Sequence, residues 1–179
     1  MKNKSGWQYY HTVWIIILFG WVVNYMVRLA LAPALLPIMK EFEISYAQAG
    51  LLMTAFFYAY VAMQFPAGYL GDRFGRKKIL TLGTLVWALA SLFTGLVNSF
   101  AMLFILRVIT GLGEGTYFGN DRPIIASYTP KEKAALGLGL SFGGLGLGMA
   151  LGISLGGAIA SVLNWRAIFI LFSLPSFLA

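Results

Sequence analysis

The sequence predicts an all-α membrane protein that crosses the bilayer several times, and three observations carry this prediction. Of 179 residues, 59% are hydrophobic and 11% are charged, whereas a soluble domain is about one quarter charged. The mean hydropathy is +0.79. The charged residues gather between long apolar runs, most of which reach the about 20 residues that a helix needs to cross a hydrocarbon core of about 30 Å.

The first three helices are separated by charged segments. A helix is expected over 12–36, an apolar run that contains a single charge, Arg28. A second is expected over 46–70, which carries no charge. A third is expected over 79–97, which follows the basic segment 71–78. Each run is long enough to span a bilayer.

The last three helices differ in length. The fourth is expected over 101–120 and contains Arg107 and Glu114, and the fifth is expected over 136–163 without any charge. The sixth, 165–179, has only 15 residues, which at about 1.5 Å per residue cover about two thirds of the hydrocarbon thickness. We therefore expect that the chain ends inside a helix and that a C-terminal half is absent.

The distribution of basic residues predicts the topology, because basic loops face the cytoplasm. On one side lie Lys2, Lys4, Arg73, Arg76, Lys77, Lys78, Arg122, Lys131 and Lys133; on the other lie only Lys40 and Arg166. We expect the N-terminus and the loops 71–78 and 121–135 on the cytoplasmic side of the plasma membrane. The net charge of +7 therefore indicates a lipid bilayer as partner and not nucleic acid. The chain has no cysteine, and we expect neither a metal nor a cofactor.

Three charged residues fall inside the predicted spans: Arg28, Arg107 and Glu114. A charge near the bilayer centre costs at least about 2.5–3.5 kcal/mol on insertion scales, so it needs a partner, a bundle interior or a water-filled cavity. The structural interpretation is that Arg107 and Glu114 pair and hold helices together. The functional interpretation, a substrate site, is favoured because ionisable groups inside membranes mark ligand and proton pathways.

The spacing of these residues predicts an anion site. Asn24, Tyr25 and Arg28 lie at positions i, i+1 and i+4, on one helix face. Arg107 and Glu114 are two turns apart on one stripe, about 10 Å along the axis. Two arginines facing one cavity favour a carboxylate or phosphate ligand. Glu114 is a candidate proton carrier, because burial and neighbouring charges govern the proton affinity of a carboxyl group.

Three motifs resemble those of the major facilitator superfamily of transporters. The segment 68–77, Gly-Tyr-Leu-Gly-Asp-Arg-Phe-Gly-Arg-Lys, resembles motif A, and 107–115, Arg-Val-Ile-Thr-Gly-Leu-Gly-Glu-Gly, resembles motif B. Trp165-Arg166 with Phe169 resembles the entry to the sixth helix. Asn24-Tyr25-x-x-Arg28, Tyr60-x-x-x-Gln64-x-Pro66 and Gly113-Glu114-Gly115 resemble the anion:cation symporter branch, which includes sugar-acid, sialic acid and vesicular glutamate carriers.

The resemblance implies a fold and a role for each matching residue. It implies the N-terminal six-helix half of a twelve-helix transporter. Arg28, Tyr25 and Asn24 would bind the substrate anion, with Tyr60 and Gln64 facing the cavity. Arg107 would lie near the anion and tune Glu114, which would carry a coupled proton. The gating motif would comprise Gly68, Asp72, Arg73, Gly75 and Arg76, with Asp72 latching the cytoplasmic gate; its position at a helix C-terminus, where the helix dipole repels it, also requires an outside partner.

Two positions depart from the branch. Val27 stands where an acidic residue often precedes the first-helix arginine, so this protein would couple fewer protons or use another ion. Gly119 stands where proline is usual, and we interpret 119–122 as a local turn ended by Pro123.

Glycines recur at every fourth position of the fifth helix, at Gly144, Gly148, Gly152 and Gly156. This pattern predicts a smooth face for close helix packing. In proton-coupled drug antiporters of the superfamily a Gly-Pro pair occupies this helix, and Gly152-Ile153 stands here. The difference favours uptake of an organic anion over drug export.

The sequence therefore predicts a secondary active transporter, not an enzyme, that moves a small organic anion such as a sugar acid, with proton symport. A carrier of a neutral sugar or a drug is the alternative within transport, and a non-transporting membrane receptor is another. An intramembrane serine hydrolase is a third, because Gly139-Leu-Ser141-Phe-Gly143 matches G-x-S-x-G; nothing, however, brings the single histidine, His11, close to Ser141.

Overall fold

The computed structural model describes residues 6–179, so Lys2 and Lys4 of the predicted charge pattern lie outside the described residues. The helices are α1 (Tyr9–Leu29), α2 (Leu31–Glu41), α3 (Tyr46–Phe74), α4 (Arg76–Thr94), α5 (Phe100–Tyr128), α6 (Ala134–Val162) and α7 (Trp165–Ser176), with a 3₁₀ turn, η1 (Lys131–Lys133). Within residues 6–179 there is no β-strand. Five spans, the first formed by α1 and α2 together, are long and apolar enough to cross a membrane. The predicted all-α membrane fold is confirmed.

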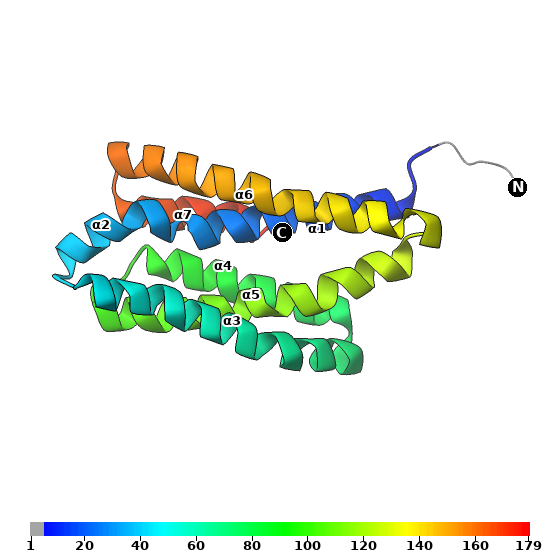
Figure 1. Ribbon diagram of the computed structural model, residues 1–179, viewed down its shortest axis with the longest axis horizontal. Helices are drawn as coiled ribbons and strands as arrows, with labels where there is room; N and C mark the ends of the chain where they lie inside the picture. The colour runs from blue at the N-terminus through cyan, green and yellow to red at the C-terminus, as the bar shows by residue number, and fades with distance from the viewer. Residues whose placement is uncertain (1–5) are drawn as a thin grey trace, which may run out of the picture.

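The first expected helix, 12–36, is divided in the structure. α1 ends at Leu29 and α2 begins at Leu31. Pro33 accounts for the break, because a proline has no N–H and its ring excludes the carbonyl of the residue four positions earlier, here Leu29. The chain therefore turns slightly just after Arg28 and keeps the same general direction (Figure 1).

The turn that we expected at 119–122 is wrong, because α5 continues through this segment to Tyr128. Pro123 removes the N–H that would bond to the Gly119 carbonyl. The guanidinium of Arg76 takes its place and donates from Nη1 to that carbonyl at 3.0 Å. The helix thus passes through the proline without leaving this partly buried carbonyl unpaired.

The helices form an elongated bundle of two groups (Figure 1). One contains α1, α2 and α6, the other contains α3, α4 and α5, and α7 packs between them against α1 and α4. The start of α1, the α3–α4 turn and the α5–α6 connection share one end, which carries the basic residues 76–78, 131 and 133. Lys40 and Arg166 lie at the other end. This separation agrees with the predicted charge pattern, and the side of the membrane on which each end lies stays a prediction.

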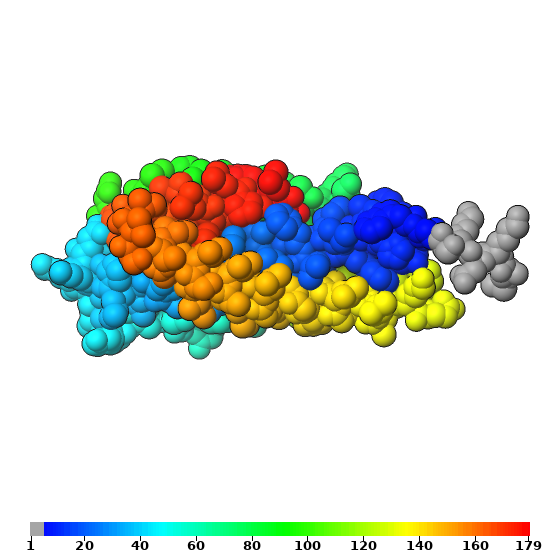
Figure 2. Space-filling model, turned by 90° about the horizontal axis from the view of Figure 1, so that it is seen from above, coloured from blue at the N-terminus to red at the C-terminus, as the bar shows by residue number. Residues whose placement is uncertain are grey.

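Glycines bring α6 into backbone contact with α1, as the four-residue repeat predicted. A Cβ atom at Gly144 or Gly152 would lie 2.8 Å from a carbonyl oxygen of α1, and one at Gly148 closer still. The carbonyls belong to Leu18, Val22 and Met26. Figure 2 shows α6 running along α1 for most of the length of the bundle. This contact fixes α1, which carries Arg28.

A polar cluster joins three elements at the end of the bundle that contains Lys40. Glu41, the last residue of α2, accepts hydrogen bonds from Arg166 Nη1 at 2.7 Å and Nη2 at 2.6 Å, and from Trp165 Nε1 at 2.8 Å. Arg166 Nη2 also donates to the carbonyl of Val97 at 2.8 Å. The cluster holds the end of α2, the α4–α5 loop and the start of α7 together.

Candidate functional site

A buried ion pair between α1 and α5 lies at the centre of the site. Arg28 Nη2 lies 2.8 Å from Glu114 Oε2, and Arg28 Nε donates to the same oxygen at 2.9 Å. Asn24 Oδ1, one turn earlier on α1, accepts from Arg28 Nη2 at 3.2 Å. The two charged side chains are 7% and 0% exposed, so the carboxylate interacts directly with the guanidinium in a nearly dry environment.

Glycines on α5 determine where Glu114 lies. A Cβ atom at Gly115 would be 2.6 Å from the carbonyl oxygen of Tyr60 on α3, and one at Gly111 would meet the carbonyl of Phe56. α5 and α3 therefore pack backbone to backbone on both sides of Glu114. This approach carries the aromatic rings of α3 up to the ion pair.

Three aromatic rings surround the Arg28 guanidinium. Its Cζ lies 4.5 Å from the centroid of Tyr25, 4.4 Å from that of Tyr60 and 5.2 Å from that of Phe56. Cation–π contacts at these distances stabilise a cation that has lost its water. The structure thus brings together four residues that the sequence analysis singled out, Asn24, Tyr25, Arg28 and Tyr60, and adds Phe56.

Arg107 is buried on α5 without an ion-pair partner among residues 6–179. Its residue is 3% exposed, and its Cζ lies 5.0 Å from the ring centroid of Phe169 on α7. The basic group bonded to Glu114 is Arg28 and not Arg107. The structural interpretation that Arg107 and Glu114 pair is therefore wrong, because the carboxylate of Glu114 forms its ion pair with Arg28 of the facing helix α1.

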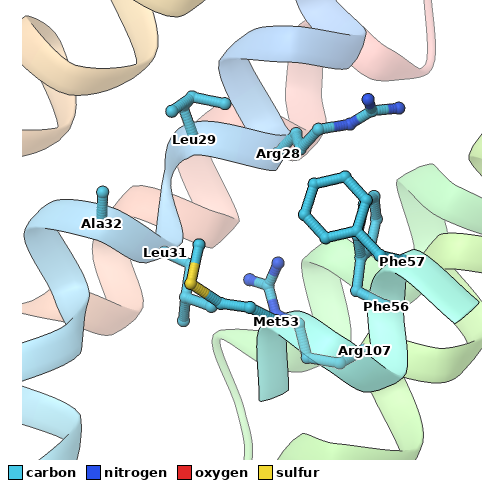
Figure 3. A pocket seen from close by; sticks show the side chains of 8 residues that line it. All are labelled: Arg28, Leu29, Leu31, Ala32, Met53, Phe56, Phe57 and Arg107. Carbon is cyan, nitrogen blue, oxygen red and sulfur yellow. The ribbon is translucent and has the colours of Figure 1, made fainter. Parts of the chain in front are cut away.

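Both arginines line one pocket of about 140 Å³. Its other walls are apolar and come from α1, α2 and α3, among them Met53, Phe56 and Phe57. Figure 3 shows the two arginines, from different helices, with these side chains around the same space. Arg28 and Arg107 thus both line a mainly apolar cavity, and the Arg28 guanidinium points away from that of Arg107 (Figure 3).

Three polar atoms around the ion pair are buried and have no hydrogen-bond partner among residues 6–179. They are Asn24 Nδ2, Arg107 Nε and Glu114 Oε1. A buried polar atom without a partner costs about 1–3 kcal/mol. Two of the three are donors and one is a carboxylate oxygen. Arg107 lines the pocket, whereas Asn24 and Glu114 are not among its lining residues. Gln64, one turn beyond Tyr60 on α3, is half-buried.

The segment expected to act as the gating motif lies at the end of the bundle that carries the basic turn. Asp72, 65% exposed, forms an ion pair with Arg76 one turn later, and Arg76 also donates to the carbonyl of Gly119. Gly75 ends α3 with φ +101°, a conformation that favours glycine. Arg73 lies over the ring of Phe74 at 5.4 Å. Arg76 thus links the motif to α5. Gly68 lies where α3 and α5 come close together, because a Cβ atom added at Gly119 of α5 would be 3.3 Å from the backbone nitrogen of Gly68.

Sequence reasoning missed a second buried carboxylate, Asp121 on α5. It is 2% exposed, and its Oδ2 accepts a hydrogen bond from Trp21 Nε1 of α1 at 2.8 Å. The signal was present in the spacing, because Arg107, Glu114 and Asp121 are seven residues apart and so share one helix stripe. Interpreting 119–122 as a turn concealed this relation.

Comparisons with known proteins agree with one another. The family model described as Major Facilitator Superfamily matches residues 17–179. The chain is 33% identical over 156 residues to "Probable anion transporter 6, chloroplastic" of Arabidopsis thaliana, covering 87% of this chain and 30% of that protein. It is 32% identical over 158 residues to the "Hexuronate transporter" of Bacillus subtilis (strain 168), covering 88% and 37%.

Among solved structures, the chain resembles a bacterial homologue of the human lysosomal transporter Spinster, captured in an inward-facing and occupied conformation. The TM-score is 0.88 at 25% identity, and the match covers 97% of this chain and 43% of the other. The chain therefore spans about a third of the length of these curated relatives and less than half of this solved structure.

Proposed function

Because the chain belongs to the Major Facilitator Superfamily, we propose that it is part of a secondary active transporter that moves a small organic anion across the plasma membrane by alternating access. It is an integral, multi-pass membrane protein of a family of transporters, not of enzymes. A second helix bundle, outside residues 1–179, completes the cavity, since superfamily transporters rock two halves around a site near the bilayer midplane.

The observation that carries this proposal is the charge balance of the pocket. Arg28 and Arg107 line the pocket, and Arg28 is already bonded to the buried carboxylate of Glu114. One positive charge, that of Arg107, is left in a buried position without an ion-pair partner among residues 6–179. An isolated buried charge is strongly unfavourable. A carboxylate on the substrate supplies the missing negative charge, which a neutral substrate does not.

The polar atoms without partners support a hydroxylated carboxylate such as a sugar acid. A carboxylate or hydroxyl oxygen accepts from Asn24 Nδ2 and Arg107 Nε, and a hydroxyl group donates to Glu114 Oε1. Two relatives are named as an anion transporter and a hexuronate transporter, and these names agree with this class.

Proton symport is proposed through Glu114. Its carboxylate and the substrate anion both interact with the arginines, so substrate binding changes the electrostatic potential at Glu114 and hence its affinity for a proton. Proton binding at Glu114 in turn releases Arg28 for the substrate. The ion pair of Arg28 with Glu114 at 2.8 Å is the contact through which this exchange takes place.

At the cytoplasmic end, Asp72 is proposed to latch the gate together with Arg76, and the N-terminus is proposed to be cytoplasmic. The basic residues at that end support this orientation.

Uptake into proteoliposomes of the complete gene product, with the interior alkaline, tests the proposal. The substrates are labelled sugar acids, sialic acid and dicarboxylates, with neutral sugars as controls. Accumulation of one acid that collapses with a protonophore, and its loss in Arg28→Ala, is expected. Normal anion uptake by Arg28→Ala removes the proposed binding site.

The alternative is a carrier of a neutral sugar or a drug. It predicts flux of uncharged or cationic compounds without anion flux, and tolerance of Arg28→Ala. A membrane receptor would bind the anion without flux.

A further inference from the structure

Glu114 and Asp121 are the two buried carboxyl groups of this chain. The sequence contains six acidic residues, all within the described range, and only these two are buried, at 0% and 2% exposure. They lie two turns apart on α5, about 10 Å along the axis. Val27 leaves no carboxyl group beside Arg28 on α1. Among the carboxyl groups of residues 6–179, Asp121 is therefore the one buried site for a further proton.

Each of the two carboxyl groups bonds to a different side chain of α1. Glu114 bonds to Arg28, and Asp121 bonds to Trp21, seven residues earlier on α1. The Trp21 indole is itself 2% exposed and lies edge-on to the Tyr117 ring, with centroids 5.2 Å apart. Asp121 thus occupies the next level of the same α1–α5 contact, closer to the end that carries the basic turn.

The bonding of Asp121 differs from that of Glu114 in a way that suits a change of charge. Its Oδ2 is bonded to a neutral indole N–H. Its Oδ1 accepts from the Arg122 backbone N–H at 2.7 Å and from Arg122 Nη1 at 3.3 Å. The Arg122 side chain is 26% exposed, and its Cζ lies 3.5 Å from the ring centroid of Phe118. Arg122 therefore keeps other contacts when Asp121 becomes neutral.

The titratable and charged groups that face Asp121 are few. On α5 they are Arg122 and Tyr117, whose phenol donates to the carbonyl of Ile17 at 3.2 Å. α1 contributes the Trp21 indole, and α6 contributes Phe142 against Arg122 at 4.7 Å; neither ring titrates.

We propose that Asp121 is a second proton-binding carboxyl group of the transport cycle, lying between Glu114 and the cytoplasmic end of the bundle. The inference rests on the proposed proton-coupled function. A proton from water on that side binds Oδ2 and converts the carboxylate into a neutral acid. The protonated oxygen then no longer accepts the Trp21 hydrogen bond as strongly, so the α1–α5 contact at this level changes with the charge of Asp121.

Asp121→Asn tests the proposal, because the amide oxygen still accepts from Trp21 while the side chain cannot titrate. Glu132→Gln is the matched control, since it removes an exposed carboxyl group of η1. The first readout is the infrared difference spectrum of the reconstituted complete gene product between pH about 5.5 and about 8, a range in which exposed carboxyl groups stay ionised. We expect a protonated-carboxyl band to which Glu114 and Asp121 both contribute. Asp121→Asn should lose the Asp121 part of this band, and Glu132→Gln should retain the whole of it. Retention of the whole band in Asp121→Asn overturns the proposal.

The second readout is accumulation of labelled D-glucuronate at a gradient of about one pH unit with the membrane potential clamped at zero. Each coupled proton then contributes about tenfold to the accumulation ratio. Asp121→Asn is expected to lower the ratio about tenfold while exchange at equal pH persists. Loss of the Asp121 part of the band with an unchanged ratio refutes the coupling role. If the wild type moves no anion, the proposed function fails, and the infrared band still decides whether Asp121 binds a proton.

Discussion

Replacing Gly148 by alanine tests the packing that holds the arginine of α1 in place. The added Cβ atom would lie 2.9 Å from the Cβ of Tyr25 and still closer to the carbonyl oxygen of Val22. Carbon atoms in ordinary contact are about 3.5–4.0 Å apart. Both obstacles belong to α1 and lie at or next to the backbone, so the two helices have to separate.

The size of the effect follows from two opposing contributions. Overpacking a well-packed interface costs about 1–3 kcal/mol, and alanine regains about 1 kcal/mol of helix propensity in a water-soluble helix. Gly146→Ala isolates the second contribution, the gain in helix propensity, because a Cβ at Gly146 meets nothing within 4 Å. The two variants make the same chemical change two residues apart in α6. Gly148→Ala is therefore expected to be about 1–3 kcal/mol less stable than Gly146→Ala.

The assay is thermal unfolding of the complete gene product in one detergent, together with affinity for the transported anion. Tyr25 contacts Gly148 and also stacks on Arg28 at 4.5 Å, so Gly148→Ala should weaken anion binding as well as lower the melting temperature. Equal melting temperatures for the two variants would refute the backbone contact between α1 and α6 as a determinant of stability. Lower stability with unchanged affinity would separate this packing from the anion site.

Three further outcomes are expected. Glu114→Gln keeps the size of the side chain but cannot carry a proton, so pH-driven accumulation should fall about tenfold per lost proton at about one pH unit while exchange persists; equal loss of both contradicts the proton role. Asp72→Asn removes the charge that pairs with Arg76, so cycling should slow more than affinity falls, and a large affinity loss alone contradicts the gating role. Glu41→Gln weakens the partly exposed pair with Arg166 and should cost about 1 kcal/mol in thermal unfolding; a loss above about 3 kcal/mol would show that the cluster is not a surface contact.

Composition, spacing and motifs were enough to predict the membrane fold and the superfamily. Apolar length and charge position are local properties, and the bilayer demands them of each helix separately. The glycine repeat likewise predicted the contact face of α6, because a helix face follows from periodicity alone. Arg28, Glu114 and their neighbours could be singled out for a similar reason, since a charge in an apolar run is visible in the sequence.

The hydrogen-bond partners of buried groups, and the points at which helices break or continue, depended on the tertiary structure. The sequence could not decide that Glu114 bonds to Arg28 rather than to Arg107, because that choice depends on how α1 lies against α5. The continuation of α5 past Pro123 was equally hidden, since the group that satisfies the Gly119 carbonyl is Arg76, 43 residues earlier in the chain. The same continuation places Asp121 in the bundle beside Trp21. Long-range hydrogen bonds to buried groups are set by packing between helices, and for that reason only the folded bundle decided them.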